Sequence, residues 1–183
     1  MLVGITGSFG AGKGFVANYL VQKKSFKHYS ARALITEVIA ERGLPINRDT
    51  MTEVANDLRA KGGPTYIFER LVAKAKAEGG DAVVESIRAV AEATYMKEQG
   101  GIVLGIDADP KLRFERIQKR GSETDKVTFT EWLAQEEREM HSDDPTKQNI
   151  AGVMQIADVV IKNNGSLGVL TAEIDNFIAT HHG

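Results

Sequence analysis

The 183-residue sequence contains no cysteine, only four prolines, and no apolar run long enough to cross a membrane. The absence of cysteine excludes disulfides and thiolate metal sites. No basic segment followed by an apolar one marks a secretory signal, and no segment approaches the roughly 20 apolar residues of a membrane span. The net charge of −2 provides no bulk attraction to nucleic acid or to an acidic membrane. We therefore expect a cytoplasmic protein that binds neither nucleic acid nor membrane.

The overall composition is that of an ordinary globular protein. Apolar residues make up 42% of the chain and charged residues 26%. A chain of this length can bury a core of its own. We expect one domain over residues 1–183, as a monomer or a homodimer.

Short apolar runs without polar alternation recur along the chain, at residues 2–6, 26–29, 82–85, 101–106 and 157–161. Such runs are typical of parallel strands that are covered on both faces. Helical patterns lie between them, at residues 13–24, 31–42, 50–61, 64–78, 88–99, 110–120, 127–140 and 166–180. This alternation predicts an α/β fold of three layers with a doubly wound, five-stranded parallel sheet. Its ligand should lie beyond the carboxyl ends of the strands.

Two stretches interrupt the alternation of strands and helices. Residues 31–78 hold three consecutive helical patterns, and residues 110–150 hold two more. We expect the core to comprise residues 1–30, 79–109 and 151–183, with two helical insertions that cover the ligand. Enzymes that transfer phosphate need such covers, because water in an open site would otherwise take the phosphoryl group.

A glycine-rich segment at residues 7–14, Gly-Ser-Phe-Gly-Ala-Gly-Lys-Gly, follows the first apolar run. It fits the phosphate-loop spacing G-x-x-x-x-G-K between a strand and a helix. Gly7 and Gly12 let the backbone curl so that its N–H groups face an anion. Lys13 adds a charge for the β- and γ-phosphates, and the helix start adds its positive end. The alternative is an ordinary glycine turn.

If the segment is a phosphate loop, the donor nucleotide contacts residues along it and at the start of the helix that follows. We expect these to be Gly7, Ser8, Gly10, Ala11, Gly12, Lys13, Gly14 and Phe15.

The segment Glu85-Ser86-Ile87-Arg88 follows the third apolar run, so its side chains should emerge at the same edge as the glycine-rich loop. A carboxylate at this edge can order water around Mg²⁺, and the fork of Arg88 can grip a phosphate. The alternative is that Glu85 and Arg88 only cap and solvate the turn between a strand and a helix.

Arg113, Arg116 and Arg120 fall on one face of a predicted helix. Arg116 and Arg120 are the better candidates to close onto the charge of a transferring phosphoryl group. A solvated face paired with Glu115 is the alternative.

In the first insertion, the polar candidates for contact with an acceptor phosphate or base are Ser30, Arg32 and Arg59. No Ser-His-Asp or zinc-binding arrangement stands out. Phosphoryl transfer does not require one, since positioning and charge neutralisation carry most of its catalysis.

These motifs resemble those of the P-loop kinases that phosphorylate nucleoside monophosphates, and of dephospho-coenzyme A kinases. The loop ends in Gly-Lys-Gly as in adenylate kinases, but Phe15 replaces their threonine, so neither position 14 nor position 15 offers a hydroxyl to a metal. Residues 85–88 resemble the family segment Asp-Gly-(Phe-Pro/Ile)-Arg, whose arginine holds the acceptor phosphate. The resemblance implies that Arg88 is the acceptor clamp.

The closest likeness is to an adenylate-kinase-like group, known mainly from archaea, whose physiological substrate is not settled. Residues 55–59, 113–116 and 157–167 carry this likeness. The last segment is also similar to the tail of dephospho-coenzyme A kinases, where the loop after the fifth strand lies beside the donor adenine. The resemblance therefore implies that Asn163, Asn164 and Gly165 lie there. The Thr-Gly-Asp segment by which adenylate kinases hold AMP is absent, and residues 29–32 stand in its place.

The resemblance implies a kinase that moves the γ-phosphate of Mg·ATP onto a nucleoside or deoxynucleoside monophosphate. Lys13, Arg88, Arg116 and Arg120 would act on the transferring group, and Glu85 would hold Mg²⁺ through water. Two alternatives remain open. One is transfer to a 3′-hydroxyl, as in dephospho-coenzyme A kinase, and the other is an ATP-binding regulatory switch with slow ATPase activity. GTP remains an alternative donor.

Overall fold

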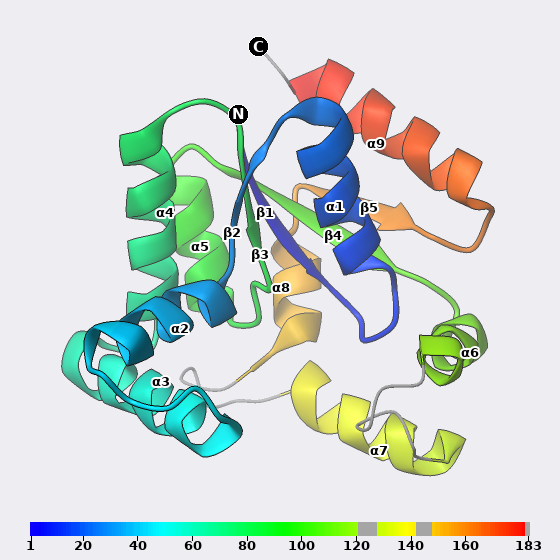
Figure 1. Ribbon diagram of the computed structural model, residues 1–183. Helices are drawn as coiled ribbons and strands as arrows, with labels where there is room; N and C mark the ends of the chain where they lie inside the picture. The colour runs from blue at the N-terminus through cyan, green and yellow to red at the C-terminus, as the bar shows by residue number, and fades with distance from the viewer. Residues whose placement is uncertain (121–127, 142–147, 182–183) are drawn as a thin grey trace.

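One parallel sheet of five strands forms the centre of the molecule (Figure 1). The computed structural model describes residues 1–120, 128–141 and 148–181. The strands lie in the order β2-β3-β1-β4-β5. Their bounds are β1 Leu2–Gly7, β2 Lys27–Tyr29, β3 Ala82–Glu85, β4 Ile102–Asp107 and β5 Val159–Lys162. The α/β fold with a five-stranded parallel sheet is therefore confirmed.

Nine helices surround the sheet in the described residues. They are α1 Lys13–Lys24, α2 Ala31–Glu41, α3 Arg48–Gly62, α4 Tyr66–Glu78, α5 Val90–Glu98, α6 Pro110–Arg120, α7 Phe129–Met140, α8 Ile150–Ile156 and α9 Leu167–His181. All but α8 occupy patterns that the sequence predicts. Helix α8 is short and apolar, and it begins where the Asn149 side chain accepts a hydrogen bond from the N–H of Gly152, at 2.8 Å. None of the described helices is long and apolar enough to cross a membrane.

Helices cover both faces of the sheet. On one face, α1 and α9 pack against apolar strand residues such as Ile5 and Leu104, both fully buried. On the other face, α4, α5 and α8 pack against residues such as Val84 and Val103. These two apolar cores explain why the strands read as continuous apolar runs rather than as alternating ones.

The register of the sheet brings three strand ends to one edge. In the central strand β1, Ile5 pairs with Glu85 of β3, and Gly7 pairs with Ile106 of β4. The loop after β1, the carboxyl group of Glu85 and the end of β4 therefore lie close together, as the sequence predicts for parallel strands.

Helices α2 and α3 on one side, and α6 and α7 on the other, lie beyond this edge, as Figure 1 shows. Helices α2, α3 and α4 pack on one another on one side. On the other side, Phe114 of α6 and Phe129 and Trp132 of α7 form an aromatic cluster with ring centroids 5.2–5.7 Å apart. That these groups act as covers, and that they divide from a core at the expected residues, stay predictions.

Candidate functional site

The turn after β1 requires glycine at specific positions. Gly7 has a φ of +137°, and a Cβ there would lie 1.9 Å from the carbonyl oxygen of Ile106. Gly12 has a φ of +107°, and a Cβ there would lie 2.6 Å from the Nδ2 atom of Asn163. Side chains at these positions would therefore collide with neighbouring segments as well as strain the backbone. The glycines serve a tightly wound loop directly before α1.

Lys13, the first residue of α1, reaches back across this loop. Its Nζ atom donates hydrogen bonds to the carbonyl oxygens of Gly7 at 2.7 Å and Ser8 at 2.9 Å. The first intrahelical bond runs from the N–H of Val16 to the oxygen of Gly12, at 3.1 Å. Earlier N–H groups of α1 thus have no acceptor within the helix. An ammonium group and a helix N-terminus meet at the loop, which is the arrangement that favours a bound anion.

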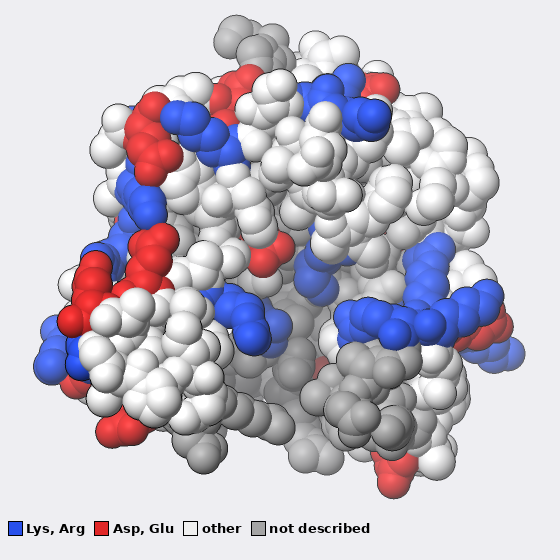
Figure 2. All heavy atoms as spheres, viewed as in Figure 1, with Lys and Arg blue, Asp and Glu red and all other residues white. Residues whose placement is uncertain are grey.

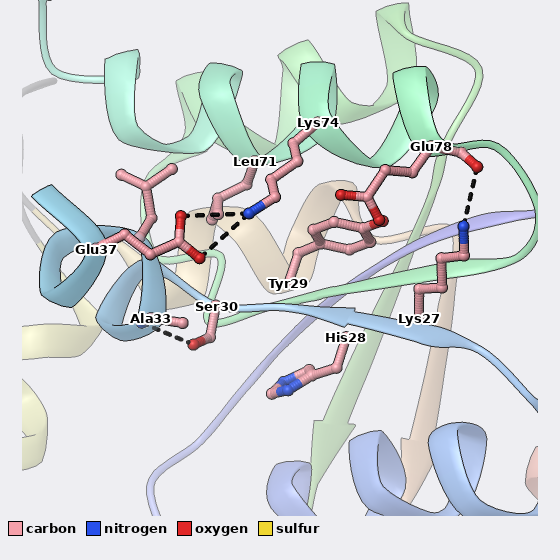
Figure 3. Close-up of a pocket in the computed structure, with 10 residues that line it drawn as sticks. Lys27, His28, Tyr29, Ser30, Ala33, Glu37, Leu71, Lys74 and Glu78 are labelled. Carbon is pink, nitrogen blue, oxygen red and sulfur yellow. Dashed lines mark hydrogen bonds and ion pairs between the residues drawn. The ribbon is translucent and has the colours of Figure 1, made fainter.

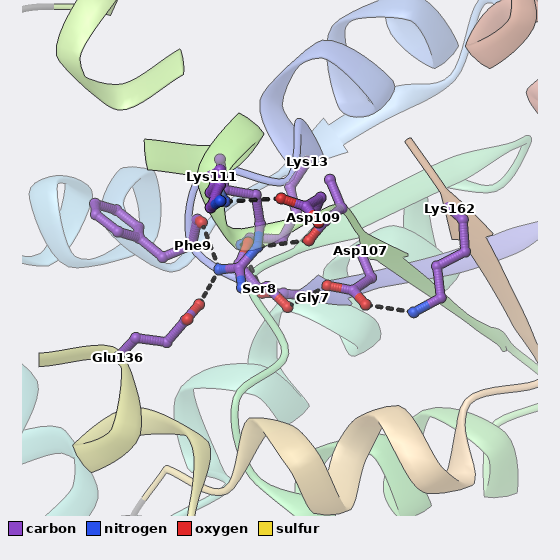
Figure 4. A network of polar contacts seen from close by, with 11 residues as sticks. Gly7, Ser8, Phe9, Lys13, Asp107, Asp109, Lys111, Glu136 and Lys162 are labelled. Atoms are coloured by element: carbon purple, nitrogen blue, oxygen red, sulfur yellow. Dashed lines mark hydrogen bonds and ion pairs between the residues drawn. The ribbon is translucent and has the colours of Figure 1, made fainter. Parts of the chain in front are cut away.

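Asp107, at the end of β4, is hydrogen-bonded to the loop. Its carboxylate accepts a hydrogen bond from the Ser8 hydroxyl at 2.7 Å and pairs with Lys162 of β5 (Figure 4). Burial opposes the ionised form, but the bonds from Lys162 and Ser8 hold the pKa of Asp107 below its ordinary value. The sequence motifs do not include this residue, although an aspartate at the carboxyl end of an apolar run is a signal for a site residue.

Asn163, directly after β5, ties a distant segment to the loop. Its side-chain N–H donates to the oxygen of Ala11 at 2.8 Å, and its own carbonyl oxygen accepts a bond from Arg116 at 2.9 Å. The other terminal nitrogen of Arg116 is buried and has no hydrogen-bond partner in the described part of the chain. Asn164 accepts a bond from the N–H of Asp109 at 2.7 Å, so it and Gly165 continue the same rim.

The arginines of α6 have different environments. Arg113 is only 5% exposed, and it donates to the oxygens of Ala108 at 2.8 Å and Phe9 at 3.2 Å. It also pairs with Glu136 of α7, which Figure 4 shows beside Phe9. Arg113 is thus an internal strut, that is, a buried side chain that joins α6 to the loop and to α7.

Two further contacts join α6 to the loop and to α7. The guanidinium of Arg120 lies 5.5 Å from the centre of the Phe9 ring, and that of Arg113 lies 5.0 Å from the centre of the Trp132 ring. Helix α6 therefore packs on the phosphate loop itself, and two of the predicted arginines, Arg116 and Arg120, lie at its rim.

A larger cavity of about 650 Å³ lies beside the loop, between the end of β3 and helices α2, α3 and α4. Four predicted residues from three segments line it, namely Arg32, Arg59, Glu85 and Arg88. We call it the arginine cavity. Figure 2 shows lysine and arginine side chains on two sides of a hollow, over α2 on one side and over α6 on the other. Three arginines around one cavity favour an anionic ligand.

Ser30 does not line the arginine cavity. Its hydroxyl caps α2 by accepting a hydrogen bond from the N–H of Ala33, at 3.1 Å. It lines a separate pocket of about 200 Å³ beside β2, where Lys74 pairs with Glu37 (Figure 3). A substrate contact for Ser30 stays a prediction, and its visible contact is a helix cap.

A small pocket of about 20 Å³ lies between the loop and the turn after β3. We call it the mouth, and its lining includes Gly7, Phe9, Lys13, Ser86 and Arg88. Ser86 and Arg88 also line the arginine cavity. The glycine-rich loop and the cavity with three arginines therefore meet at a shared wall.

Two polar residues outside the sequence motifs, Glu92 and Gln148, hold Arg88. The carboxylate of Glu92 accepts the N–H of Arg88 at 2.9 Å and that of Ala89 at 3.2 Å, and the side chain of Gln148 accepts a bond from the Arg88 guanidinium at 3.1 Å. Burial raises the pKa of Glu92, against the lowering effect of these N–H bonds and of the charges on Arg59 and Arg88. Neither residue belongs to a motif, which is why the sequence alone does not reveal them.

Glu85 is the polar end of β3. Its carboxylate lies 3.2 Å from the Nε2 atom of His28, and its side chain is 30% exposed at the arginine cavity. Among the described residues, no group of three or more His, Cys, Asp or Glu side chains is arranged to hold a metal. An accessible carboxylate oxygen nevertheless has the chemistry that suits Mg²⁺ through its water shell.

The strand order, the glycine-rich loop with its lysine and the layers of helices define the P-loop kinase fold, which is the fold of nucleotide-dependent phosphotransferases. Residues 3–144 match the family model described as an AAA domain, and the chain belongs to that family. A UPF0200 protein of Pyrococcus horikoshii is 28% identical over 186 residues, which cover 98% of this chain and 96% of that protein.

Solved structures of kinases share the fold. Shikimate kinase from Acinetobacter baumannii superposes with a TM-score of 0.63 at 16% identity, over 98% of this chain and 93% of that one. Dephospho-CoA kinase from Campylobacter jejuni superposes with a TM-score of 0.61 at 18% identity, over 97% and 95%. At these identities the likeness establishes the architecture alone.

Proposed function

We propose that this protein is a phosphotransferase that moves the γ-phosphate of ATP onto the phosphate group of a nucleoside or deoxynucleoside monophosphate. The observation that carries the proposal is the wall shared by the mouth, where Lys13 lies, and the arginine cavity. A donor phosphate at the loop and an acceptor phosphate on Arg88 would approach each other at this wall. Transfer requires this proximity more than any acid or base.

The acceptor class follows from the charges of the arginine cavity. Arg32, Arg59 and Arg88 come from three segments, and their charge suits a phosphate-bearing acceptor. Of the two carboxylates in this cavity, Glu92 is engaged by two backbone N–H groups and Glu85 by His28. The cavity therefore provides arginines that can bind a phosphate, whereas both of its carboxylates, which could deprotonate a hydroxyl, already have partners. This favours the monophosphate acceptor over the 3′-hydroxyl.

In the proposed reaction, an oxygen of the acceptor phosphate bonds to the γ-phosphorus while the bond to the β-phosphate oxygen breaks, and ADP leaves. Lys13 and the loop amides hold the donor phosphates, and Arg88 holds the acceptor. Arg116 and Arg120, which contact the loop rim, stabilise the transferring charge. Mg²⁺, when bound, neutralises the phosphate oxygens, and Glu85 would order its water shell.

The donor base would lie beside the loop that follows β5. One buried nitrogen of Arg116, which has no hydrogen-bond partner among the described residues, lies next to the loop of Asn163, Asn164 and Gly165. A nucleotide bound at that rim would supply the hydrogen-bond acceptor that this Arg116 nitrogen lacks among the described residues. The two helical groups, α2–α4 and α6–α7, would act as the covers that exclude water.

A coupled assay of ADP formation tests the proposal directly. Purified protein is incubated with Mg·ATP and, in turn, with each nucleoside and deoxynucleoside monophosphate and with dephospho-coenzyme A. We expect one or more monophosphates to raise ADP formation well above the rate with water alone. If dephospho-coenzyme A is the substrate that does so, the acceptor assignment is wrong. If no small acceptor does so, the transferase proposal fails and a slow ATPase switch is favoured.

Arg88→Ala tests the assigned role of the clamp. We expect the acceptor KM to rise by about tenfold or more and kcat to fall, because a charged hydrogen bond to phosphate is lost. ATP affinity should change by less than about twofold. Arg70→Ala, which removes an exposed arginine of α4 outside the cavity, is the matched control. It should leave the acceptor KM, kcat and ATP affinity unchanged. Loss of ATP binding with intact acceptor binding would refute the role.

A further inference from the structure

Ser86 has a backbone conformation that normally belongs to glycine. Its φ is +71°, and of the described non-glycine residues only Ser25, with a φ of +61°, shares this region. A side chain in this region costs free energy relative to glycine. Such strain persists where the surrounding structure enforces it, and it concentrates at functional sites.

The residues on either side fix this turn. Ile87 donates its N–H to the oxygen of Ile5 at 3.0 Å, and its own oxygen accepts a bond from the Thr6 hydroxyl at 2.9 Å. Glu85 is still paired in the sheet with Ile5. The chain must therefore turn sharply at Ser86, and it does so at the wall between the mouth and the arginine cavity.

The position gives the Ser86 hydroxyl a place near both expected phosphates. Ser86 lines the mouth together with Lys13, and it lines the arginine cavity together with Arg59 and Arg88. Hydrogen bonds within the described ranges do not engage its side chain. Positions 14 and 15 of the loop, Gly and Phe, have no hydroxyl to offer. Ser86 is thus an available hydroxyl where the donor and acceptor sites meet.

We propose that Ser86 is a catalytic residue, and the proposal rests on the phosphotransferase function above. Its hydroxyl donates a hydrogen bond to a non-bridging oxygen of the phosphoryl group as that group passes from ATP to the acceptor. Ser86 keeps its proton throughout, since the only bonds that form and break are those at the transferring phosphorus. This contact accounts for a serine where glycine would relieve the backbone.

Three variants separate the hydroxyl from the backbone effect. Ser86→Gly removes both the hydroxyl and the strain, Ser86→Ala removes only the hydroxyl, and Ser25→Gly removes strain at an exposed site after α1. We expect Ser86→Gly to raise Tm yet lower kcat by about tenfold or more, as loss of a hydrogen bond to a charged group implies. Ser86→Ala should lose kcat equally without the gain in Tm. Ser25→Gly should gain Tm at unchanged kcat.

A binding measurement tests Ser86 independently of any acceptor. Calorimetry compares ADP with a non-hydrolysable ATP analogue, in wild type and in Ser86→Gly. We expect the variant to bind the analogue about tenfold more weakly and to bind ADP with unchanged affinity, because only the analogue carries a γ-phosphate. Wild-type kcat in Ser86→Gly, or equal effects on both nucleotides, would overturn the role. If wild type phosphorylates no acceptor, the proposed function fails, and this comparison still decides whether Ser86 contacts the γ-phosphate.

Discussion

Removing Arg113 should destabilise the fold strongly, because its charge is buried and shared among several partners. The residue is 5% exposed, and the side chain of its ion-pair partner Glu136 is 11% exposed. Arg113→Ala leaves this nearly buried carboxylate without a cation, which typically costs about 3–5 kcal/mol. It also leaves the oxygens of Phe9 and Ala108 without their donor. For a chain of this length, the expected loss corresponds to a fall in Tm of about 6–20 °C.

Urea unfolding followed by circular dichroism measures this loss, with two comparison variants. Arg70→Ala should stay within about 0.5 kcal/mol of wild type, since Arg70 is exposed. The double variant Arg113→Met/Glu136→Leu should be less destabilised than Arg113→Ala, because it leaves no unpaired buried carboxylate. Since Phe9 lies in the phosphate loop, Arg113→Ala should also weaken nucleotide binding. A loss below about 1 kcal/mol would refute the internal-strut assignment.

Three further predictions concern other parts of the site. Asn163→Ala removes a buried hydrogen bond to the oxygen of Ala11, so it should cost about 1–3 kcal/mol of stability in urea unfolding and weaken ADP binding by about tenfold in calorimetry; unchanged affinity would contradict the role of Asn163 in positioning the loop. Because burial raises the pKa of Glu92 above its usual 4.5, the native state binds more protons than the unfolded state, so wild-type stability should lose a contribution as pH rises from about 4.5 through the raised pKa. Glu92→Gln should flatten that slope in urea titrations, and an unchanged slope would contradict the assignment. Trp132 is the single tryptophan and is fully buried between α6 and α7, so Mg·ATP should change its fluorescence if these helices close over the loop; a signal identical with and without ATP would contradict closure.

The parts of the fold that could be predicted from the sequence are those that local patterns determine. Buried parallel strands read as apolar runs, and the spacing of Gly7, Gly12 and Lys13 reflects a loop whose geometry excludes side chains at its glycines. Helix α8 was not predicted because its seven residues, five of them apolar, form less than a full periodic pattern and run directly toward β5. Short apolar segments are ambiguous between helix and strand.

The parts of the site that could not be predicted depend on contacts between distant segments. Asn163 reaches Ala11 across 152 positions, and Glu92 holds the backbone of Arg88 from within α5. The arginine face of α6 could be predicted, but the burial of Arg113 depends on where α7 lies, which periodicity does not reveal. Similarly, nothing in the residue type marks Ser86, whose importance comes from its backbone conformation and its place between two pockets.

Nucleotide binding by the phosphate loop is the claim on which the rest of the account depends. Calorimetry of Mg·ATP binding to wild type and to Lys13→Ala, with Lys74→Ala as a control outside the mouth and the arginine cavity, tests it most directly. We expect wild type and Lys74→Ala to bind with equal affinity, and Lys13→Ala to bind at least about tenfold more weakly with its fold intact. Failure of the wild-type protein to bind ATP at millimolar concentration with magnesium present, or equal binding by Lys13→Ala, would contradict the account.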